Sequence, residues 1–283
     1  MRLIGLEIAP QGKIPVKVVL AKHPVPCLKL ACTSIPLFVL LCIVLWPSGV
    51  HAKNRKIVVA AASDLSYALK EIASGFEAET GAEAVLAFGS TGMLSKQIRE
   101  GAPFDVFLSA DAGYMDGLEK DGFVLPGTSG VYARGRIVLA VNKSSGISAT
   151  GLKDLLMPDV GPIAIANPEH APYGRAAMEA LKAEGIWDAV KGRLVYGENI
   201  RQALQFVQTG NARAGIVALS VAGVPEITYK AIDGALHNPI SQSLGILRGA
   251  KDVGLAMDFA AYVKGEKGRS VLKRYGFMLP GEF

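Results

Sequence analysis

Short runs of small and β-branched apolar residues alternate with longer segments of helical periodicity from Lys56 to the C terminus. The first run covers residues 57–62, and apolar residues then recur at helical spacing up to Gly81. Further strands are expected at 84–88, 105–109, 136–141, 162–166, 214–218 and 241–247, and further helices at 93–98, 115–120, 174–183, 200–207, 255–263 and 271–275. This alternation predicts an α/β fold.

Composition and charge narrow the classes to which this chain can belong. Half of its 283 residues are apolar and 19% are charged, which is too hydrophobic for a disordered chain. Five of the 30 basic residues and one of the 25 acidic residues lie in positions 1–52, so the rest of the chain has a net charge of +1. Nucleic-acid binding requires a basic surface, so we expect no nucleic-acid partner.

The first 52 residues have the order of a secretory signal peptide. Basic residues precede an apolar run at 31–46, and Val50 and Ala52 stand three positions and one position before the expected cleavage site. We therefore expect cleavage after Ala52 and export of the processed chain. A membrane anchor is the alternative, but an anchor needs about 20 apolar residues and this run is shorter.

Cysteines are confined to the signal segment, at Cys27, Cys32 and Cys42. The processed chain would therefore have no disulfide and no thiolate metal site, so its stability would depend on its core. No linker rich in proline, glycine and serine divides the remaining sequence. We expect two interwoven lobes rather than two independent domains.

Standard catalytic signatures are missing beyond the signal segment. The sequence lacks the phosphate-binding G-x-x-x-x-G-K-[ST] pattern, G-x-G-x-x-G after a strand, H-E-x-x-H and G-x-S-x-G. A triad of Ser63, His170 and Asp111 stays open on composition alone, but no local pattern supports it. We expect His170 to be a loop residue that is hydrogen-bonded to nearby backbone.

Two other groups of polar residues could suggest acid–base catalysis or metal binding. Asp105 and Asp111 flank an expected strand, where about 20 Å would separate them, too far for a pair of catalytic carboxylates. We expect structural roles for both. Glu169 and His170 offer two potential metal ligands where a site needs three or four, so we expect no metal ion and no cofactor.

A recurring local pattern points to a different chemistry. Four expected helices begin at a short polar or turn segment, at Ser63-Asp64, Ser90-Thr91-Gly92, Pro172-Tyr173-Gly174 and Glu198-Asn199-Ile200, and the first two segments directly follow expected strands. Each junction leaves backbone N–H groups without intrahelical partners at the positive end of a helix dipole. Any single junction is explained by ordinary helix capping. As a converging set, the four junctions predict an oxyanion site that needs no basic side chain.

Six sequence motifs resemble those of the periplasmic molybdate-binding proteins of ABC importers. They are A-A-S-D-L-S-Y-A-L (61–69), F-G-S-T-G-M-L-S-K-Q-I (88–98), G-A-P-F-D-V-F-L-S-A-D (101–111), A-N-P-E-H-A-P-Y-G (166–174), E-N-I-R-Q-A-L (198–204) and K-R-Y-G-F (273–277). The resemblance implies a type II periplasmic-binding-protein fold, in which two α/β lobes close on a tetrahedral oxyanion. It also implies a first lobe of residues 56–135 and 240–283 and a second lobe of residues 136–239.

The resemblance assigns the oxyanion-binding positions to the four junctions. These positions are Ser63, Asp64, Ser90, Thr91, Tyr173 and Ile200. Ile200 would act through its main-chain N–H, so its side chain would matter only for packing.

Two positions depart from the family pattern. Ala218 stands where many members carry a tyrosine, and we expect Tyr173 to supply a tyrosine near the ion instead. Asp64 would repel a dianion if its carboxylate faced the site, so we expect it to cap a helix beginning at Leu65 and to offer only its N–H. If Asp64 does face the ligand, it could accept a proton from a protonated oxyanion and favour phosphate-like species.

The function that the resemblance implies is capture without catalysis. A monomeric receptor would bind molybdate, with tungstate as a close analogue, and deliver it to the membrane permease of an ABC transporter. A sulfate or phosphate receptor is the alternative of the same class. An exported serine hydrolase that uses Ser63 or Ser90 is the alternative of a different class.

Overall fold

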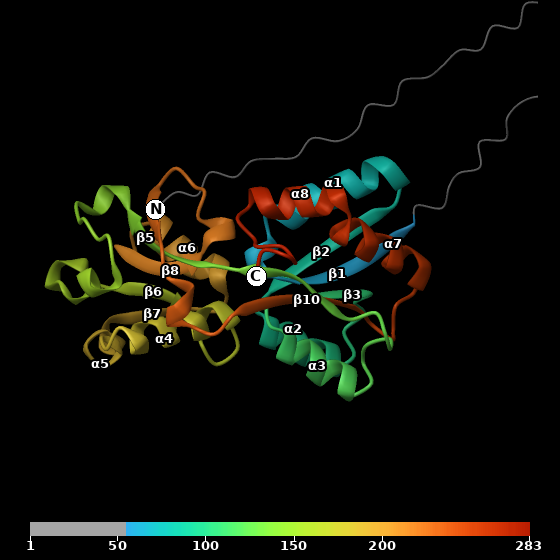
Figure 1. The fold of residues 1–283 in the computed structure, drawn as a ribbon, viewed down its shortest axis with the longest axis horizontal. Helices are drawn as coiled ribbons and strands as arrows, with labels where there is room; N and C mark the ends of the chain where they lie inside the picture. Colours follow the sequence, from blue (N-terminus) through green and yellow to red (C-terminus); the bar gives the residue numbers. More distant parts are fainter. Residues whose placement is uncertain (1–54) are drawn as a thin grey trace, which may run out of the picture. The chain divides into compact units, whose positions relative to one another are not determined.

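The structure is a computed structural model that describes residues 55–283, so the expected signal segment lies outside the described residues. Within this range the chain forms two five-stranded sheets with helices packed on them (Figure 1). None of the helices in the described range has the length and apolar character needed to cross a bilayer.

The first sheet has the strand order β2-β1-β3-β10-β4. Its strands are β1 (Lys56–Ala62), β2 (Glu83–Gly89), β3 (Val106–Ser109), β4 (Gly130–Gly135) and β10 (Ile240–Ile246). Strand β1 lies at the centre of the parallel part and pairs with β2 and β3, whereas β10 is antiparallel to β3 and β4. Because β1, β2 and β3 are parallel, their carboxyl ends meet at one edge of the sheet.

The second sheet repeats this arrangement with the order β7-β6-β8-β5-β9. Its strands are β5 (Ile137–Asn142), β6 (Ile163–Ala166), β7 (Leu194–Gly197), β8 (Ala214–Ala218) and β9 (Ile227–Ala231). Strand β6 is parallel to β7 and β8, and β5 is antiparallel to β8 and β9. The neighbouring parallel strands β6 and β7 therefore end at one edge of the second sheet, as β1 and β2 do in the first sheet.

Helices cover both faces of the first sheet (Figure 1). They are α1 (Ala68–Thr80), α2 (Thr91–Arg99), α3 (Ala112–Lys120), α7 (Val253–Lys264) and α8 (Glu266–Arg274). Val59 and Ala61 belong to the apolar cluster of α1, α7 and α8, whereas Ala60 and Phe107 belong to that of α2 and α3. Strand residues that are buried on both faces explain why the strands read as continuous apolar runs.

The second sheet is covered by α4 (Pro172–Ala183), α5 (Trp187–Val190) and α6 (Ile200–Gln208) (Figure 1). Helix α6 buries Ile200, Ala203, Leu204 and Val207, as their helical spacing predicts. We call the first sheet with its five helices the first lobe and the second sheet with its three helices the second lobe.

Two connections join the lobes. The chain passes from the first sheet to the second between β4 and β5, and it returns between β9 and β10. Gly135 ends β4 at the first crossing, where a Cβ atom would lie only 2.0 Å from the phenolic oxygen of Tyr173. Glycine at this position therefore lets Tyr173, which belongs to the second lobe, pack against the connection.

The sequence-based expectations hold for the fold class and for most elements. Three strands were not anticipated, namely β4, β7 and β9, and each is an edge strand. Helix α5 was not anticipated either, and α8 begins at Glu266 rather than at 271. The start of the first helix was also misplaced. Residues Ser63–Leu65 form a 3-10 turn, and α1 begins only at Ala68.

Candidate functional site

A small cavity lies beyond the carboxyl ends of β1, β2 and β3 of the first lobe and of β6 and β7 of the second lobe. The centre of a water-sized sphere can move through only about 10 Å³ of it, and it is lined by Ala62, Ser63, Asp64, Gly89, Ser90, Thr91, Ala110, Ala171, Pro172, Tyr173 and Ile200. All six positions predicted from the sequence are in this lining. No lysine, arginine or histidine side chain lines it among the described residues. The polar groups of the lining residues are thus hydroxyls, main-chain groups and one carboxyl.

Ser63 follows β1 directly and is almost fully buried. Its hydroxyl donates a hydrogen bond of 3.0 Å to the carbonyl of Gly89, at the end of the neighbouring strand β2. The 3-10 turn that contains Ser63 has no side-chain cap. The hydroxyl is therefore held at the cavity wall, and a rotation of its O–H bond would turn the proton toward a ligand.

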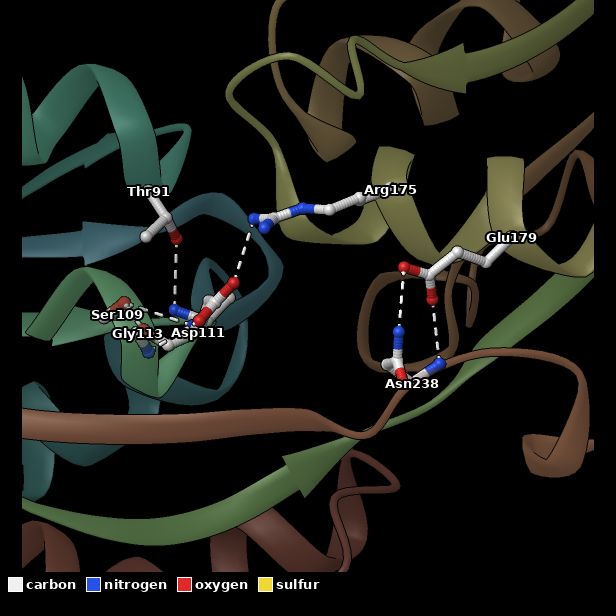
Figure 2. Close-up of polar contacts among 8 residues, drawn as sticks. Thr91, Ser109, Asp111, Gly113, Arg175, Glu179 and Asn238 are labelled. Atoms are coloured by element: carbon white, nitrogen blue, oxygen red, sulfur yellow. Dashed lines mark hydrogen bonds and ion pairs between the residues drawn. The ribbon is translucent and has the colours of Figure 1, made fainter. Parts of the chain in front are cut away.

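Thr91 is the first residue of α2 and is fully buried. Its Oγ1 accepts a hydrogen bond of 3.1 Å from the N–H of Ala110, which follows β3 (Figure 2). A hydroxyl has one proton and two lone pairs, and here a lone pair is already used. The proton of Thr91 thus remains available for an acceptor in the cavity.

Ser90 and His170 contact each other across the two lobes. The Oγ of Ser90 lies 2.9 Å from Nδ1 of His170, 80 residues further along the chain. The carbonyl of His170 also accepts a bond of 2.9 Å from the N–H of Gly92. His170 is a loop residue whose N–H bonds to the nearby carbonyl of Asn167 at 3.4 Å, as expected, but its ring and carbonyl also bond across the lobes, because the loop before α4 packs directly on the N terminus of α2.

The second lobe presents two helix N termini to the cavity. Tyr173 follows Pro172 at the start of α4, and Ile200 is the first residue of α6. The side chain of Asn199 caps α6 by accepting bonds from Arg201 N (3.0 Å) and Gln202 N (3.2 Å). Within residues 55–283 the N–H of Ile200 has no hydrogen-bond acceptor, so it is free to donate into the cavity.

Asp64 departs from its expected role. Its side chain caps no helix; instead its Oδ2 accepts hydrogen bonds of 2.8 Å from the Tyr173 hydroxyl and 2.8 Å from Nε2 of Gln242. The expectation that Asp64 caps a helix beginning at Leu65 is wrong, because no α-helix begins there and the carboxyl turns toward the crossing strands. The other oxygen, Oδ1, has no hydrogen-bond partner.

Burial dominates the electrostatics of this carboxyl. Removal from water raises the pKa of Asp64 to about 7, although the donors Tyr173 and Gln242 lower it. Burial, and then the nearby Asp64 charge, raise the pKa values of Tyr173 and Tyr132 well above the usual tyrosine value. Asp64 therefore exchanges its proton near neutral pH, while both phenols keep theirs.

The other candidate groups have structural partners. Asp105 accepts bonds from the backbone N–H groups of Val58 (2.6 Å) and Lys251 (2.7 Å). Asp111 caps α3 and pairs with Arg175 at 2.9 Å, which joins the two lobes (Figure 2). Both aspartates therefore have the structural roles expected of them.

The triad that composition left open does not assemble. The Ser63 hydroxyl bonds to a backbone carbonyl, and Asp111 bonds to Arg175 rather than to His170. No group of three or more histidine, cysteine, aspartate or glutamate residues that could hold a metal ion occurs among the described residues.

Two residues near the cavity were missed by the sequence reasoning. Gln242 lies fully buried on β10 and bonds to both Asp64 and Tyr173, the latter at 3.2 Å. Tyr132 on β4 is buried with an unpartnered hydroxyl. The polar Ser241-Gln242-Ser243 segment within an expected strand was the available signal for Gln242, whereas nothing in the local sequence distinguishes Tyr132.

Comparisons with known proteins agree with this geometry. A family model described as bacterial extracellular solute-binding protein matches residues 57–278. The chain belongs to this family. The molybdate-binding protein ModA of Azotobacter vinelandii is 40% identical over 232 residues, which is 81% of this chain and 92% of the relative. The ModA protein of Rhodobacter capsulatus is 33% identical over 228 residues, with 80% and 90% covered.

A solved structure gives the same result for the fold of this solute-binding protein. The periplasmic molybdate-binding protein of Azotobacter vinelandii matches with a TM-score of 0.75 and 32% identity, over 79% of this chain and 99% of that structure. The predicted resemblance to the molybdate-binding proteins and the predicted two-lobed fold are therefore confirmed. The relatives are binding proteins rather than enzymes by name.

Proposed function

We propose that this protein is an exported receptor that captures molybdate, and its close analogue tungstate, and delivers the ion to the permease of an ABC importer. No bond is made or broken in this function, and no cofactor takes part. The proposed receptor is a monomer whose signal peptide is removed after Ala52, so that it acts in the periplasm. Its relatives' names support the choice of ion.

One observation carries the proposal. The hydroxyls of Ser63, Ser90 and Thr91 line the same small cavity as the N terminus of α6 and Tyr173 of α4, and no cation lines it. Main-chain and hydroxyl donors without a counter-ion are suited to a compact anion, whose charge they share among many hydrogen bonds. A cavity of this kind, enclosed from two lobes, supports capture of a tetrahedral oxyanion.

The donor set also supports selection by size and protonation. Neutral donors at fixed positions bind best the ion whose radius matches their spacing. A protonated ligand oxygen would point its own proton at a protein donor, where it finds no acceptor. Molybdate and tungstate, which are similar in size, should therefore bind alike, and the smaller sulfate should bind far more weakly. Phosphate, which is partly protonated near neutral pH, should also bind weakly unless Asp64 accepts its proton.

Calorimetric titration with molybdate, tungstate, sulfate and phosphate tests the proposal. We expect tight binding of the first two ions and a melting temperature that rises with ion concentration as RT ln(1 + [L]/Kd). Equal affinity for sulfate and molybdate would contradict the proposed selectivity. Tight phosphate binding would instead indicate that Asp64 acts as an acceptor toward the ligand.

Closure of the lobes is part of the proposed function. The first lobe, residues 56–135 and 240–283, and the second, residues 136–239, each supply donors that can all reach one ion only when the cleft is shut. Small-angle scattering should show a smaller radius of gyration in the presence of molybdate. An unchanged radius at saturation would argue against closure on the ion.

A hydrolase remains the second candidate because Ser90 lies 2.9 Å from His170, within the reach of a nucleophile and its base. Within the described residues, however, no carboxylate bonds to His170 to orient the ring. Incubation with a fluorophosphonate tests this candidate directly. Covalent labelling that is lost in Ser90→Ala would support a hydrolase, whereas an unlabelled protein that binds molybdate supports the receptor.

A further inference from the structure

The helix cap at Ser90 is unusual for this chain. Ser90 occupies the N-cap position of α2, yet its side chain accepts no bond from the helix. Asp111, Asn199 and Asp252 stand at the same position of other helices, and each of their side chains does accept such a bond. Serine is a preferred N-cap residue, so the missing cap indicates that the hydroxyl of Ser90 is committed elsewhere.

The partner of Ser90 is held firmly in place. The loop before α4 is folded on Asn167, which accepts bonds from Ala171 N (2.9 Å) and Glu169 N (3.0 Å). From this loop, His170 reaches the other lobe through its ring and through its carbonyl, which accepts the N–H of Gly92. A Cβ atom on Gly92 would lie 2.9 Å from Cβ and from the carbonyl oxygen of His170, so the approach requires a glycine there.

The hydrogen bond between Ser90 and His170 has two possible directions. If Nδ1 of the ring carries a proton, it donates to Ser90, and the serine proton is free for the cavity. If Nδ1 is bare, Ser90 must donate to it, and the serine oxygen presents only lone pairs to the cavity. An oxyanion would be repelled by the second arrangement and bound by the first.

We propose that His170 is a positioning residue for the oxyanion site. In its Nδ1–H form it donates to Ser90 across the lobe interface and thereby orients the Ser90 hydroxyl as a donor to the bound ion. This role rests on the function proposed above, and it adds a residue that does not line the cavity.

Substitutions at both ends of the bond test the proposal through molybdate affinity. We expect Ser90→Ala and His170→Ala each to weaken binding about tenfold, which is the lower end for a hydrogen bond to a charged group. The double variant should be no weaker than the weaker single variant, because both substitutions act through the Ser90 hydroxyl, which His170→Ala leaves unoriented and Ser90→Ala removes. His170→Asn should rescue most of the loss, since its amide NH₂ can stand at the place of Nδ1. His170→Gln, whose amide reaches the place of Nε2, should not.

Nitrogen-15 NMR of the histidine rings supplies a readout that a merely structural role would not move. With molybdate bound, Nδ1 of His170 should carry a proton. His237 is the matched control, because its Nδ1 lies 2.7 Å from the carbonyl of Asn238, outside the cavity lining. The ring signal of His237 should not change when molybdate is added, and His237→Ala should bind molybdate with the affinity of the parent protein.

The outcomes separate this role from the function on which it rests. Failure of the parent protein to bind any of the four oxyanions overturns the proposed function and this role together. Tight binding by the parent with equal affinity in His170→Ala overturns the role of His170 alone. Additive losses in the double variant, or a bare Nδ1 in the complex, also overturn it.

Discussion

The two lobes share a strand arrangement but contribute different chemistry to the cavity. In each sheet the first and second parallel strands, β1 and β2 or β6 and β7, bring their carboxyl ends to the site. The first lobe presents hydroxyl side chains there, on Ser63, Ser90 and Thr91. The second lobe presents the N terminus of α6 and a phenol that already donates to Asp64.

Helix capping explains the difference between the lobes. In the second lobe the side chain of Asn199 is used to cap α6, and α4 begins with Pro172, which has no N–H to satisfy. In the first lobe neither Ser63 nor Ser90 caps its own helix or turn. We therefore expect oxyanion binding to be sensitive to side chains in the first lobe and to the main chain in the second.

The strongest test of this comparison removes two hydroxyls from the first lobe. Ser63→Ala and Thr91→Ala should each weaken molybdate binding by roughly 10- to 100-fold, because hydrogen bonds to a charged group are worth about 1.5 to 3 kcal/mol each. The double variant should approach the product of the two losses if each hydroxyl contacts the ion separately. Isothermal titration calorimetry measures these changes.

Two controls accompany the hydroxyl variants. Thr91→Ser keeps both the hydroxyl proton and the acceptor for Ala110 N, so its affinity should stay within a few-fold of the parent. Ser95→Ala removes a buried hydroxyl of the same helix that accepts from Arg99 and does not line the cavity. Parental affinity in both Ser63→Ala and Thr91→Ala would show that this constellation does not bind the ion.

The next largest effect is expected at Asp64, as a change in stability with pH. Its pKa is about 7 in the folded protein, above the ordinary value of 3.8, so the folded state favours the protonated form. This contribution is fully present below about pH 4 and is lost as the pH rises through 7. Relative to Asp64→Asn, the parent should lose up to about 4 kcal/mol of unfolding free energy between pH 4 and pH 8. Urea unfolding at several pH values measures the difference.

An exposed aspartate provides the control for the sign of this effect. Backbone bonding to Leu255 N, and then the Arg55 side chain, hold the pKa of Asp252 below its usual value. Its contribution to stability is therefore lost on acidification, opposite to that of Asp64. If Asp64→Asn followed the parent at every pH, Asp64 would have an ordinary pKa and the burial argument would be wrong.

The contrast between the lobes also shows what a sequence reveals about such a site. The six lining positions were predictable because each lies in a polar or turn segment next to the start of a helix or turn, where backbone N–H groups lack intrahelical partners. The succession of strands, polar segments and helices along the sequence is enough for that inference. The match to family motifs then fixed which residue of each junction to choose.

Contacts between residues far apart in the sequence were not predictable in the same way. Gln242 reaches Asp64 within the first lobe from 178 residues away, and His170 reaches Ser90 across the two lobes from 80. These pairs depend on how distant segments of the chain pack together, which no local pattern encodes. The same reason explains the error at Asp64, because a helix cap is a local role and the observed partners are distant.

In the second lobe, the main-chain donor at Ile200 can be removed without removing the helix. Ile200→Pro deletes the N–H at the first helical position, where proline is well tolerated, and the preceding Asn199 is already extended (φ −148°, ψ 175°). We expect about a tenfold loss of molybdate affinity from this one donor. Ile200→Ala, which removes packing but keeps the N–H, is the control, and Ile200→Val should be nearly silent. Equal losses in the proline and alanine variants would assign the effect to packing.

The smallest expected effect concerns an ion pair that joins the lobes outside the cavity. Arg175 on α4 contacts Asp111 at 2.9 Å, and their side chains are 40% and 27% exposed (Figure 2). Solvent screening limits such a pair to about 1 kcal/mol, so Arg175→Gln should weaken molybdate binding by no more than about fivefold. The loss should shrink at high ionic strength, because salt screens exposed charges.

Arg99 and Asp121 form a pair of similar exposure within the first lobe, at 2.8 Å. Arg99→Gln should therefore leave affinity unchanged, since that pair is made whether the lobes are open or closed. An equal, salt-independent loss in both variants would show that the contact between Arg175 and Asp111 does not contribute to closure.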